Sequence, residues 1–286
     1  MKKYKIIDLF AGIGGIRKGF ERASSNRIEC VFTSEWDKYS QITYKANNSN
    51  EEVYGDITEI DEKLIPNHDI LLAGFPCQPF SQAGLKKGFS DTRGTLFFDI
   101  ERILIEKQPK AFLLENVKRL RSHDGGKTLT TIIEHVKKAG YNNVQTKVLR
   151  ARDFGLPQNR ERIFIIGFLD EKVKFEFPKP TLEPTRVGDI LENKVDEKYT
   201  ISDKLWAGHQ RRKRENKLKG KGFGYGIVDK NSDDFIIPVS DTQAYRQFGN
   251  SVPVNVIEKI AEQMLKHIRL DGKERDNKSF KQFIEV

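Results

Sequence analysis

Short apolar runs, separated by stretches long enough for helices, most constrain the fold of this 286-residue chain. Residues 4–10, 28–33 and 69–73 are rich in aliphatic and β-branched side chains, and each run ends near glycine, proline or an acidic residue. Such runs are typical of strands that are buried on both faces of a parallel sheet. A helix at about 95–107 and a strand at 111–115 continue the alternation, which favours an α/β fold with a doubly wound, mostly parallel sheet.

The pattern changes in the second half of the chain. Residues 144–150 and 162–168 flank a connection that contains glycine and proline, which predicts an antiparallel hairpin at the sheet edge. Residues 171–235 are rich in Lys, Pro and Gly and show little periodicity, apart from a segment that opens at Ser202, a candidate helix N-cap. Helical spacing returns at Ile257, Ile260, Ala261, Met264, Leu265 and Ile268.

We therefore divide the chain into a large domain at 1–170, a small irregular region at 171–238, a segment at 239–270 that returns to the large domain, and a polar tail at 271–286.

Composition narrows the class of protein. No stretch approaches the roughly 18 apolar residues of a membrane span, and the first residues lead into a strand-like run rather than a signal peptide. The only cysteines, Cys30 and Cys77, stand in different contexts, which argues against a disulfide framework or a zinc site. We expect a cytoplasmic protein without a metal. The net charge of +9 suits a polyanionic partner, although a basic surface can also serve only solubility.

A glycine-rich turn, Asp8 to Gly15, follows the first strand and leads into a helix. Glycine lets the backbone approach a ligand closely, but an ordinary tight turn would use the same residues. Glu35 ends the next strand and could hold a pair of ribose hydroxyls, and Asp56 ends a strand-like stretch at 53–56 and could accept from an adenine amino group. Each acid could instead be a helix N-cap.

The second motif is the loop from Gly74 to Gln82, in which two prolines flank Cys77. A lone cysteine is most often a small buried hydrophobe, and Cys30 fits that interpretation. Cys77 differs, because a stiff loop at the carboxyl end of a strand is where active sites lie in this type of fold.

Further motifs follow in order: Glu115-Asn116-Val117, Gln158 to Arg162, a basic segment from Arg211, and Gln247 to Pro253. Together with the two motifs above, they resemble the motif series of the DNA (cytosine-5)-methyltransferase family, of the bacterial restriction-modification type. The resemblance covers residues 4–168 and 240–268 well and the region between them only in part. It implies the S-adenosylmethionine-dependent methyltransferase fold, with residues 171–238 as the target-recognition region.

The resemblance implies a covalent mechanism. Cytosine C5 is a weak nucleophile, and addition of the Cys77 thiolate to C6 would make it enamine-like. The family assigns the relief of charge at N3 to the glutamate that is Glu115 here. Arg160 and Arg162 share a face if they lie on a strand; by resemblance one orients the cytosine O2 and both organise the site. Taken alone, Glu115 fits a buried acid paired with a base, and the arginines fit surface ion pairs.

Double-stranded DNA is the implied partner, and its target base must be flipped out of the helix to reach Cys77. By resemblance, Gln78, Ser81 and Gln82 belong to a mobile loop that closes over this base. Between Arg211 and Lys221 the chain carries seven basic residues and one acid, a net charge of +6, and this run is usually a solvated face. Its place in the recognition region favours phosphate contact by Arg211, Arg212, Lys213 and Arg214.

The implied cofactor is S-adenosylmethionine, with S-adenosylhomocysteine as product. A glycine-rich turn also suits NAD, but no dehydrogenase pairing of catalytic residues accompanies it. By resemblance, the donor would contact residues from four parts of the chain: Phe10, Gly12, Gly14 and Gly15 at the methionine, Glu35 and Trp36 at the ribose, Asp56 and Ile57 at the adenine, and Asn250, Ser251 and Val252 at the closing side.

The family pattern fails between Tyr225 and Asp233, where several tens of residues are missing from this sequence. A true deletion, a half supplied by a partner or an omitted loop would each explain the gap. The alternatives to an active DNA enzyme are a remnant that binds donor but methylates weakly, and an RNA cytosine-5 methyltransferase. We expect a monomer from a bacterium or phage. A cognate restriction endonuclease in the same system is possible, and no stable complex with it is implied.

Overall fold

A six-stranded sheet forms the centre of the computed structural model, which describes residues 2–25, 27–49, 51–76, 96–186, 202–218 and 235–269. The strands are β1 (Tyr4–Leu9), β2 (Ile28–Ser34), β3 (Ile70–Gly74), β4 (Ala111–Val117), β5 (Asn143–Arg150) and β6 (Glu161–Phe168). The helices are α1 (Gly15–Ala23), α2 (Lys38–Asn47), α4 (Phe97–Lys107), α5 (Lys127–Lys138), α6 (Asp203–Leu218), α7 (Asp241–Asn250) and α8 (Val254–Leu265).

The strand order is β2-β1-β3-β4-β6-β5, with β1 to β4 parallel. Strand β6 runs antiparallel to both of its neighbours, so β5 and β6 form the predicted hairpin at the edge. The doubly wound, mostly parallel sheet is therefore confirmed. Its central strands are buried on both faces, which explains why they read as continuous apolar runs rather than as alternating ones.

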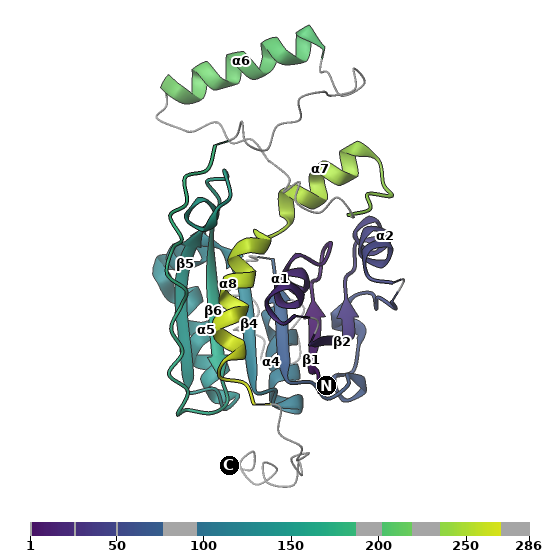
Figure 1. Ribbon diagram of the computed structural model, residues 1–286, viewed down its shortest axis with the longest axis vertical. Coiled ribbons are helices and arrows are strands. Elements are labelled where there is room, and N and C mark those ends of the chain that lie inside the picture. The colour runs from purple at the N-terminus through teal and green to yellow at the C-terminus, as the bar shows by residue number, and fades with distance from the viewer. Residues whose placement is uncertain are drawn as a thin grey trace.

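Helices cover both faces of the sheet (Figure 1). Helices α1 and α8 pack on one face through residues such as Phe20 and Ile257, and α4 and α5 pack on the other through residues such as Ile100 and Ile132. The contact between α1 and α8 is close, because a Cβ atom on Gly19 would lie 2.5 Å from Ile257. The C-terminal helical spacing predicted a helix here, and α8 (Val254–Leu265) confirms it.

Two features of the fold differ from the sequence-based expectation or were missed by it. Helices α2, α5 and α7 lie in stretches for which no helix was predicted. The strand-like stretch at 53–56 is reduced to a single bridge between Tyr54 and Ser34. Asp56 then serves as the N-cap of a short 3-10 helix, because its side chain accepts from the Thr58 N–H at 3.0 Å.

Helices α6 and α7 lie beyond the carboxyl ends of the parallel strands (Figure 1). The segment that leads into α7 is fixed on α2: the Asn47 side chain donates to the Ile236 carbonyl at 2.7 Å and accepts from the Ile236 N–H at 2.8 Å. The predicted tail at 271–286 lies outside the described residues. None of the helices in the described ranges is both long and apolar enough to cross a membrane.

Candidate active site

A cavity of about 550 Å³ opens where the parallel strands end. Its wall is formed by segments that follow β1, β2, β3 and β4 and by the turn between α7 and α8. The position follows from the topology, because the carboxyl ends of parallel strands meet at one edge and leave a crevice where the strand order reverses, here between β1 and β3.

All the residues predicted to contact the donor line this cavity except Gly14. Gly14 lies behind the wall in a left-handed conformation, with φ of +86°, and forms the N-cap of α1. A Cβ atom on Gly15 would lie 2.9 Å from the Ser251 hydroxyl oxygen and 2.9 Å from a Val252 methyl carbon. Glycine at 15 therefore lets the turn at 251–252 pack directly on the start of α1.

Glu35 joins the ends of two strands at the cavity wall. Its carboxylate accepts from the Gly12 N–H at 2.7 Å and from the Asp37 N–H at 2.8 Å. Burial raises the pKa of Glu35, against the two backbone donors, which lower it. A carboxylate has about four lone-pair sites, so capacity for a pair of ligand hydroxyls remains.

The exposed side chain of Trp36 lies at the same wall of the cavity. Trp36 is 72% exposed although it lines the cavity, whereas Ile57 on the neighbouring segment is buried. A flat, accessible ring next to an apolar side chain is suited to the face of a nucleobase. Asp56 also lines this part, and its cap to Thr58 uses one carboxylate oxygen, Oδ1. Both interpretations of Asp56, cap and cavity residue, thus hold in the structure.

The opposite part of the cavity holds a buried acid paired with an arginine, and the charge of a second arginine acts on it. Glu115 Oε1 forms an ion pair with Arg162 Nε at 2.9 Å. Burial raises the pKa of Glu115 to about 7, although the charges of Arg162 and Arg160 act to lower it. Arg160 comes just before β6, where its Nη1 donates to the Gly249 carbonyl at 2.9 Å. Burial, followed by the charge of Arg162, lowers the pKa of Arg160 to about 10.

The loop that carries Cys77 begins close to Glu115, after the end of β3. Asn116, next to Glu115, is buried and donates from its side chain to the Phe75 carbonyl at 2.9 Å. Pro76 lines the cavity and directly precedes Cys77 in the chain. Cys77 itself, together with Gln78, Ser81 and Gln82, lies outside the described residues. The described geometry brings the start of this loop, Glu115 and Arg162 to one cavity.

The basic run lies elsewhere. Arg211, Arg212, Lys213 and Arg214 are exposed on α6, and Arg211 forms a loose i,i+4 ion pair with Glu215 at 3.8 Å. None of these side chains lines the cavity.

Sequence reasoning missed some of the lining residues, namely Ser40 on α2 and Arg246 and Gln247 on α7. The Thr43 hydroxyl donates to the side-chain carbonyl of Gln247 at 2.9 Å, a buried bond between α2 and α7. The motif from Gln247 to Pro253 contained a signal for Gln247, because its residues pass from the end of a helix into the cavity turn. No signal in the sequence pointed to Ser40.

The comparisons with known proteins agree with this geometry. The family model "C-5 cytosine-specific DNA methylase" matches residues 4–234 and 231–266. The type II methyltransferase M.NlaX of Neisseria lactamica is 58% identical over 302 positions, which cover 91% of this chain and 96% of that protein. The type II methyltransferase M1.ScrFI of Lactococcus lactis subsp. cremoris is 53% identical over 308 positions, which cover 92% of this chain and 78% of that protein.

Solved structures share the fold at low identity. A DNMT2 mutant from Spodoptera frugiperda has a TM-score of 0.68 at 20% identity. The match covers 93% of this chain and 99% of the DNMT2 chain. The Entamoeba histolytica methyltransferase EhMeth has a TM-score of 0.70 at 20% identity. The match covers 94% of this chain and 100% of the EhMeth chain.

Both comparisons at the sequence level indicate that positions are missing from this chain, and the family match indicates where. The alignment with M.NlaX has 302 positions, whereas 91% of 286 residues is about 260, so about 40 positions of the relative have no counterpart here. The family match divides at 231–234, close to the predicted gap between Tyr225 and Asp233. Apart from this shortened stretch, the match spans most of the chain, and the chain belongs to the C-5 cytosine-specific DNA methylase family.

Proposed function

We propose that this chain transfers a methyl group from S-adenosylmethionine to C5 of a cytosine in double-stranded DNA, through a covalent bond between Cys77 and C6. The observation that carries the proposal is that two groups of residues line one and the same cavity. Residues suited to a nucleoside, Glu35 and Trp36, share it with the Glu115–Arg162 pair and with Pro76, the residue before Cys77.

The donor fits the groups in the cavity wall. Glu35 retains acceptor sites for the ribose hydroxyls, and Trp36 and Ile57 offer apolar surfaces to the adenine. The N-terminus of α1 has no acidic residue in its first turn and no side-chain cap, so its positive end can face the donor's carboxylate. When bound, the donor supplies an electrophilic methyl group on a sulfonium.

The chain's own residues would activate the base. The Cys77 thiolate forms a bond to C6. The electron pair of the C5–C6 double bond then forms a C4–C5 double bond, and the electron pair of the C4–N3 double bond moves onto N3. The protonated carboxyl of Glu115 donates to N3, and the Arg162 guanidinium beside it neutralises charge that develops on the ring. When C5 takes the methyl group, the C4–N3 double bond reforms and the N3 proton returns to the Glu115 carboxylate. A base then removes the C5 proton, and the electron pair of that bond reforms the C5–C6 double bond and expels Cys77 as thiolate.

The target base must leave the duplex, because neither C6 nor C5 is accessible to these groups within a base stack. We propose that Gln78, Ser81 and Gln82 contact DNA around the flipped base. Residues 171–238 would form the recognition region, and the exposed basic run on α6 would contact phosphates.

Replacing Arg211, Arg212, Lys213 and Arg214 by alanine should weaken DNA binding for all sequences alike. Each phosphate contact that is lost should reduce the slope of log K against log salt by up to about 0.9. Alanine preserves helix propensity, so α6 is retained. The measurement is a salt titration of DNA affinity by fluorescence anisotropy.

The matched control removes the same charge from the other end of the sheet, by alanine at Lys137, Lys138, Lys172 and Lys174, which are all exposed. This control should leave the salt slope nearly unchanged. An equal slope of log K against log salt for the α6 variant and the wild type would show that the basic run is only a solvated surface without phosphate contacts.

The shortened recognition region should affect target reading more than donor binding. The cavity residues proposed to bind the donor, which we call the donor wall, lie outside the gap between Tyr225 and Asp233. Base discrimination, in contrast, needs base-edge contacts worth roughly 1–3 kcal/mol each. We expect the chain to bind S-adenosylhomocysteine and DNA but to methylate weakly and without a clear target.

Titration of S-adenosylhomocysteine and bisulfite mapping on mixed-sequence DNA test this expectation side by side. Efficient methylation of one short sequence would show that the remaining region suffices. Turnover on a matched RNA but not on DNA would favour the RNA enzyme, and donor binding without any turnover would favour the remnant.

A further inference from the structure

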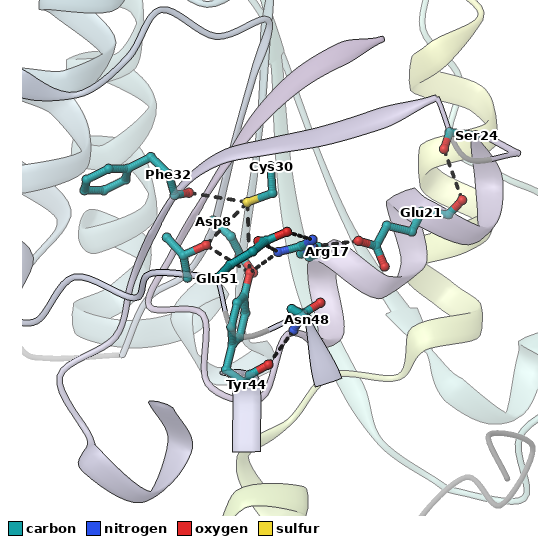
Figure 2. Close-up of polar contacts among 10 residues, drawn as sticks. Asp8, Arg17, Glu21, Ser24, Cys30, Phe32, Tyr44, Asn48 and Glu51 are labelled. Carbon is teal, nitrogen blue, oxygen red and sulfur yellow. Dashed lines mark hydrogen bonds and ion pairs between the residues drawn. The ribbon is translucent and has the colours of Figure 1, made fainter. Parts of the chain in front are cut away.

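A buried polar cluster lies beneath the glycine-rich turn, centred on the hydroxyl of Tyr44 (Figure 2). This hydroxyl lies 3.0 Å from Thr33 Oγ1, receives a hydrogen bond from Arg17 Nη1 at 3.1 Å and lies 3.5 Å from Asp8 Oδ2. Tyr44 is fully buried and the other three side chains are nearly so. We call Asp8, Arg17, Thr33 and Tyr44 the Tyr44 cluster.

Each member of the cluster comes from an element that leads into the cavity wall. Strand β1 carries Asp8 and continues to Phe10 and Gly12, and β2 carries Thr33 and continues to Glu35. Helix α1 carries Arg17 and begins at Gly15, and α2 carries Tyr44 one turn after Ser40. A single hydroxyl thus joins the four elements that hold most of the donor wall.

The Tyr44 ring also supports the turn directly. A Cβ atom on Gly14 would lie 3.1 Å from Tyr44 Cε2, so the turn packs on the ring. Arg17 is fixed in its turn by Glu51, which accepts from both Nη atoms, and by Glu21, which accepts from Nε at 2.7 Å. The guanidinium is therefore held over the ring and against the hydroxyl, with its centre 5.7 Å from the ring centroid.

The acid of the cluster is poorly compensated. Burial raises the pKa of Asp8 to about 8; Arg17 and Tyr44 lower it, and Glu21 and Glu35 raise it. Cys30 on β2 and Glu51 complete the titratable groups that face the cluster. Below this pKa the Asp8 carboxyl is neutral and the hydroxyl contact is compatible with burial, whereas ionisation leaves a buried charge with Arg17 as its nearest cation.

We propose that the Tyr44 hydroxyl positions the donor-binding wall, by holding β1, β2 and α1 in the arrangement that S-adenosylmethionine binds, without contacting the donor itself. This inference rests on the proposed donor binding. Loss of the hydroxyl would leave the wall in its binding arrangement only part of the time, and the apparent affinity would be multiplied by the fraction of molecules in that arrangement.

The test is isothermal titration of S-adenosylhomocysteine into the wild type and Tyr44→Phe. We expect the dissociation constant to rise about tenfold, because the cost of the lost hydrogen bond falls on the binding arrangement of the wall. The turnover number at saturating donor and DNA should stay within about twofold, because no reacting group changes. Thr33→Val removes another contact of the same hydroxyl and should act in the same direction.

The matched control is Tyr141→Phe. Tyr141 is also fully buried, and its hydroxyl donates to the Pro109 carbonyl at 2.8 Å, away from the cavity. It should lower the melting temperature to a similar extent but leave the dissociation constant unchanged. A second readout is pH: wild-type affinity should fall as pH rises through about 8, and Asp8→Asn should remove that part of the fall.

Wild-type affinity in Tyr44→Phe would overturn the inference, as would an equal loss in Tyr141→Phe. If Tyr44→Phe does not fold, Thr33→Val and the pH profile of Asp8→Asn decide in the same way. Failure of the wild type to bind S-adenosylhomocysteine would instead refute the proposed function.

Discussion

Cys77→Ala should abolish methyl transfer while the affinity for S-adenosylhomocysteine stays close to that of the wild type. Without the thiolate, C6 receives no nucleophile and C5 does not become enamine-like, so the loss should reach the limit of detection. Donor binding should survive, because Cys77 is not among the residues that line the described donor wall: Phe10, Gly12, Gly15, Glu35, Trp36, Asp56, Ile57 and Asn250 to Val252. Single-turnover methylation and calorimetry measure the two properties separately.

A trapping experiment identifies the nucleophile without a mutation. In DNA with 5-fluorocytosine at the target, C5 carries fluorine, which cannot leave as a cation, so the adduct to the enzyme should accumulate. Tryptic digestion separates the two cysteines, since Cys77 falls in residues 64–86 and Cys30 in residues 28–38. An adduct on the Cys30 peptide, or turnover by Cys77→Ala at the wild-type rate, would refute the covalent mechanism.

Glu115→Gln should reduce the rate of methyl transfer by about 10² to 10³, the usual effect of removing one donor that stabilises developing charge. Glutamine keeps an N–H donor and nearly the same shape, but it cannot transfer a proton to N3. Because the pKa of Glu115 is raised to about 7 by burial, the protonated form is abundant below pH 7 and is lost as the pH rises through that value.

The pH profile distinguishes this role from mere packing. The wild-type rate at saturating donor and DNA should decline above pH 7, and Glu115→Gln should lack that decline. Glu134→Gln, an exposed carboxylate on α5, serves as the control and should keep the wild-type profile. If the rate of Glu115→Gln declined above pH 7 to the same extent, the decline would belong to a group other than Glu115.

The sequence predicted the sheet and the cavity because both depend on local patterns. The strands are buried on both faces and therefore read as apolar runs. Gly12 and Gly14 adopt positive φ angles, which few other residues tolerate, and Gly15 leaves room for the turn at 251–252. The loop at 53–56 was misjudged, since one bridge to Ser34 replaces the predicted strand.

The Tyr44 cluster could not be predicted in the same way. Asp8 appears in the sequence as part of a ligand-binding turn, and only the tertiary structure shows that its carboxyl points to Tyr44, 36 residues away. Likewise, nothing in the order of residues predicts that Thr43 bonds with Gln247, 204 residues further along the chain. Partners of buried polar groups are set by packing, which local propensity does not encode.

The pairing of Asn47 with both backbone groups of Ile236 has a consequence for how such enzymes diversify. It fixes the point at which the chain rejoins α2, and α7 and the cavity turn follow from that point. The entropy cost of closing a loop grows only with the logarithm of its length, so a longer or shorter stretch before Ile236 changes little behind it. M.NlaX carries about 40 positions that this chain lacks, judged from 302 aligned positions against about 260 residues. An anchor of this kind would allow target-reading segments to be exchanged between lineages as cassettes while the inherited chemistry is kept.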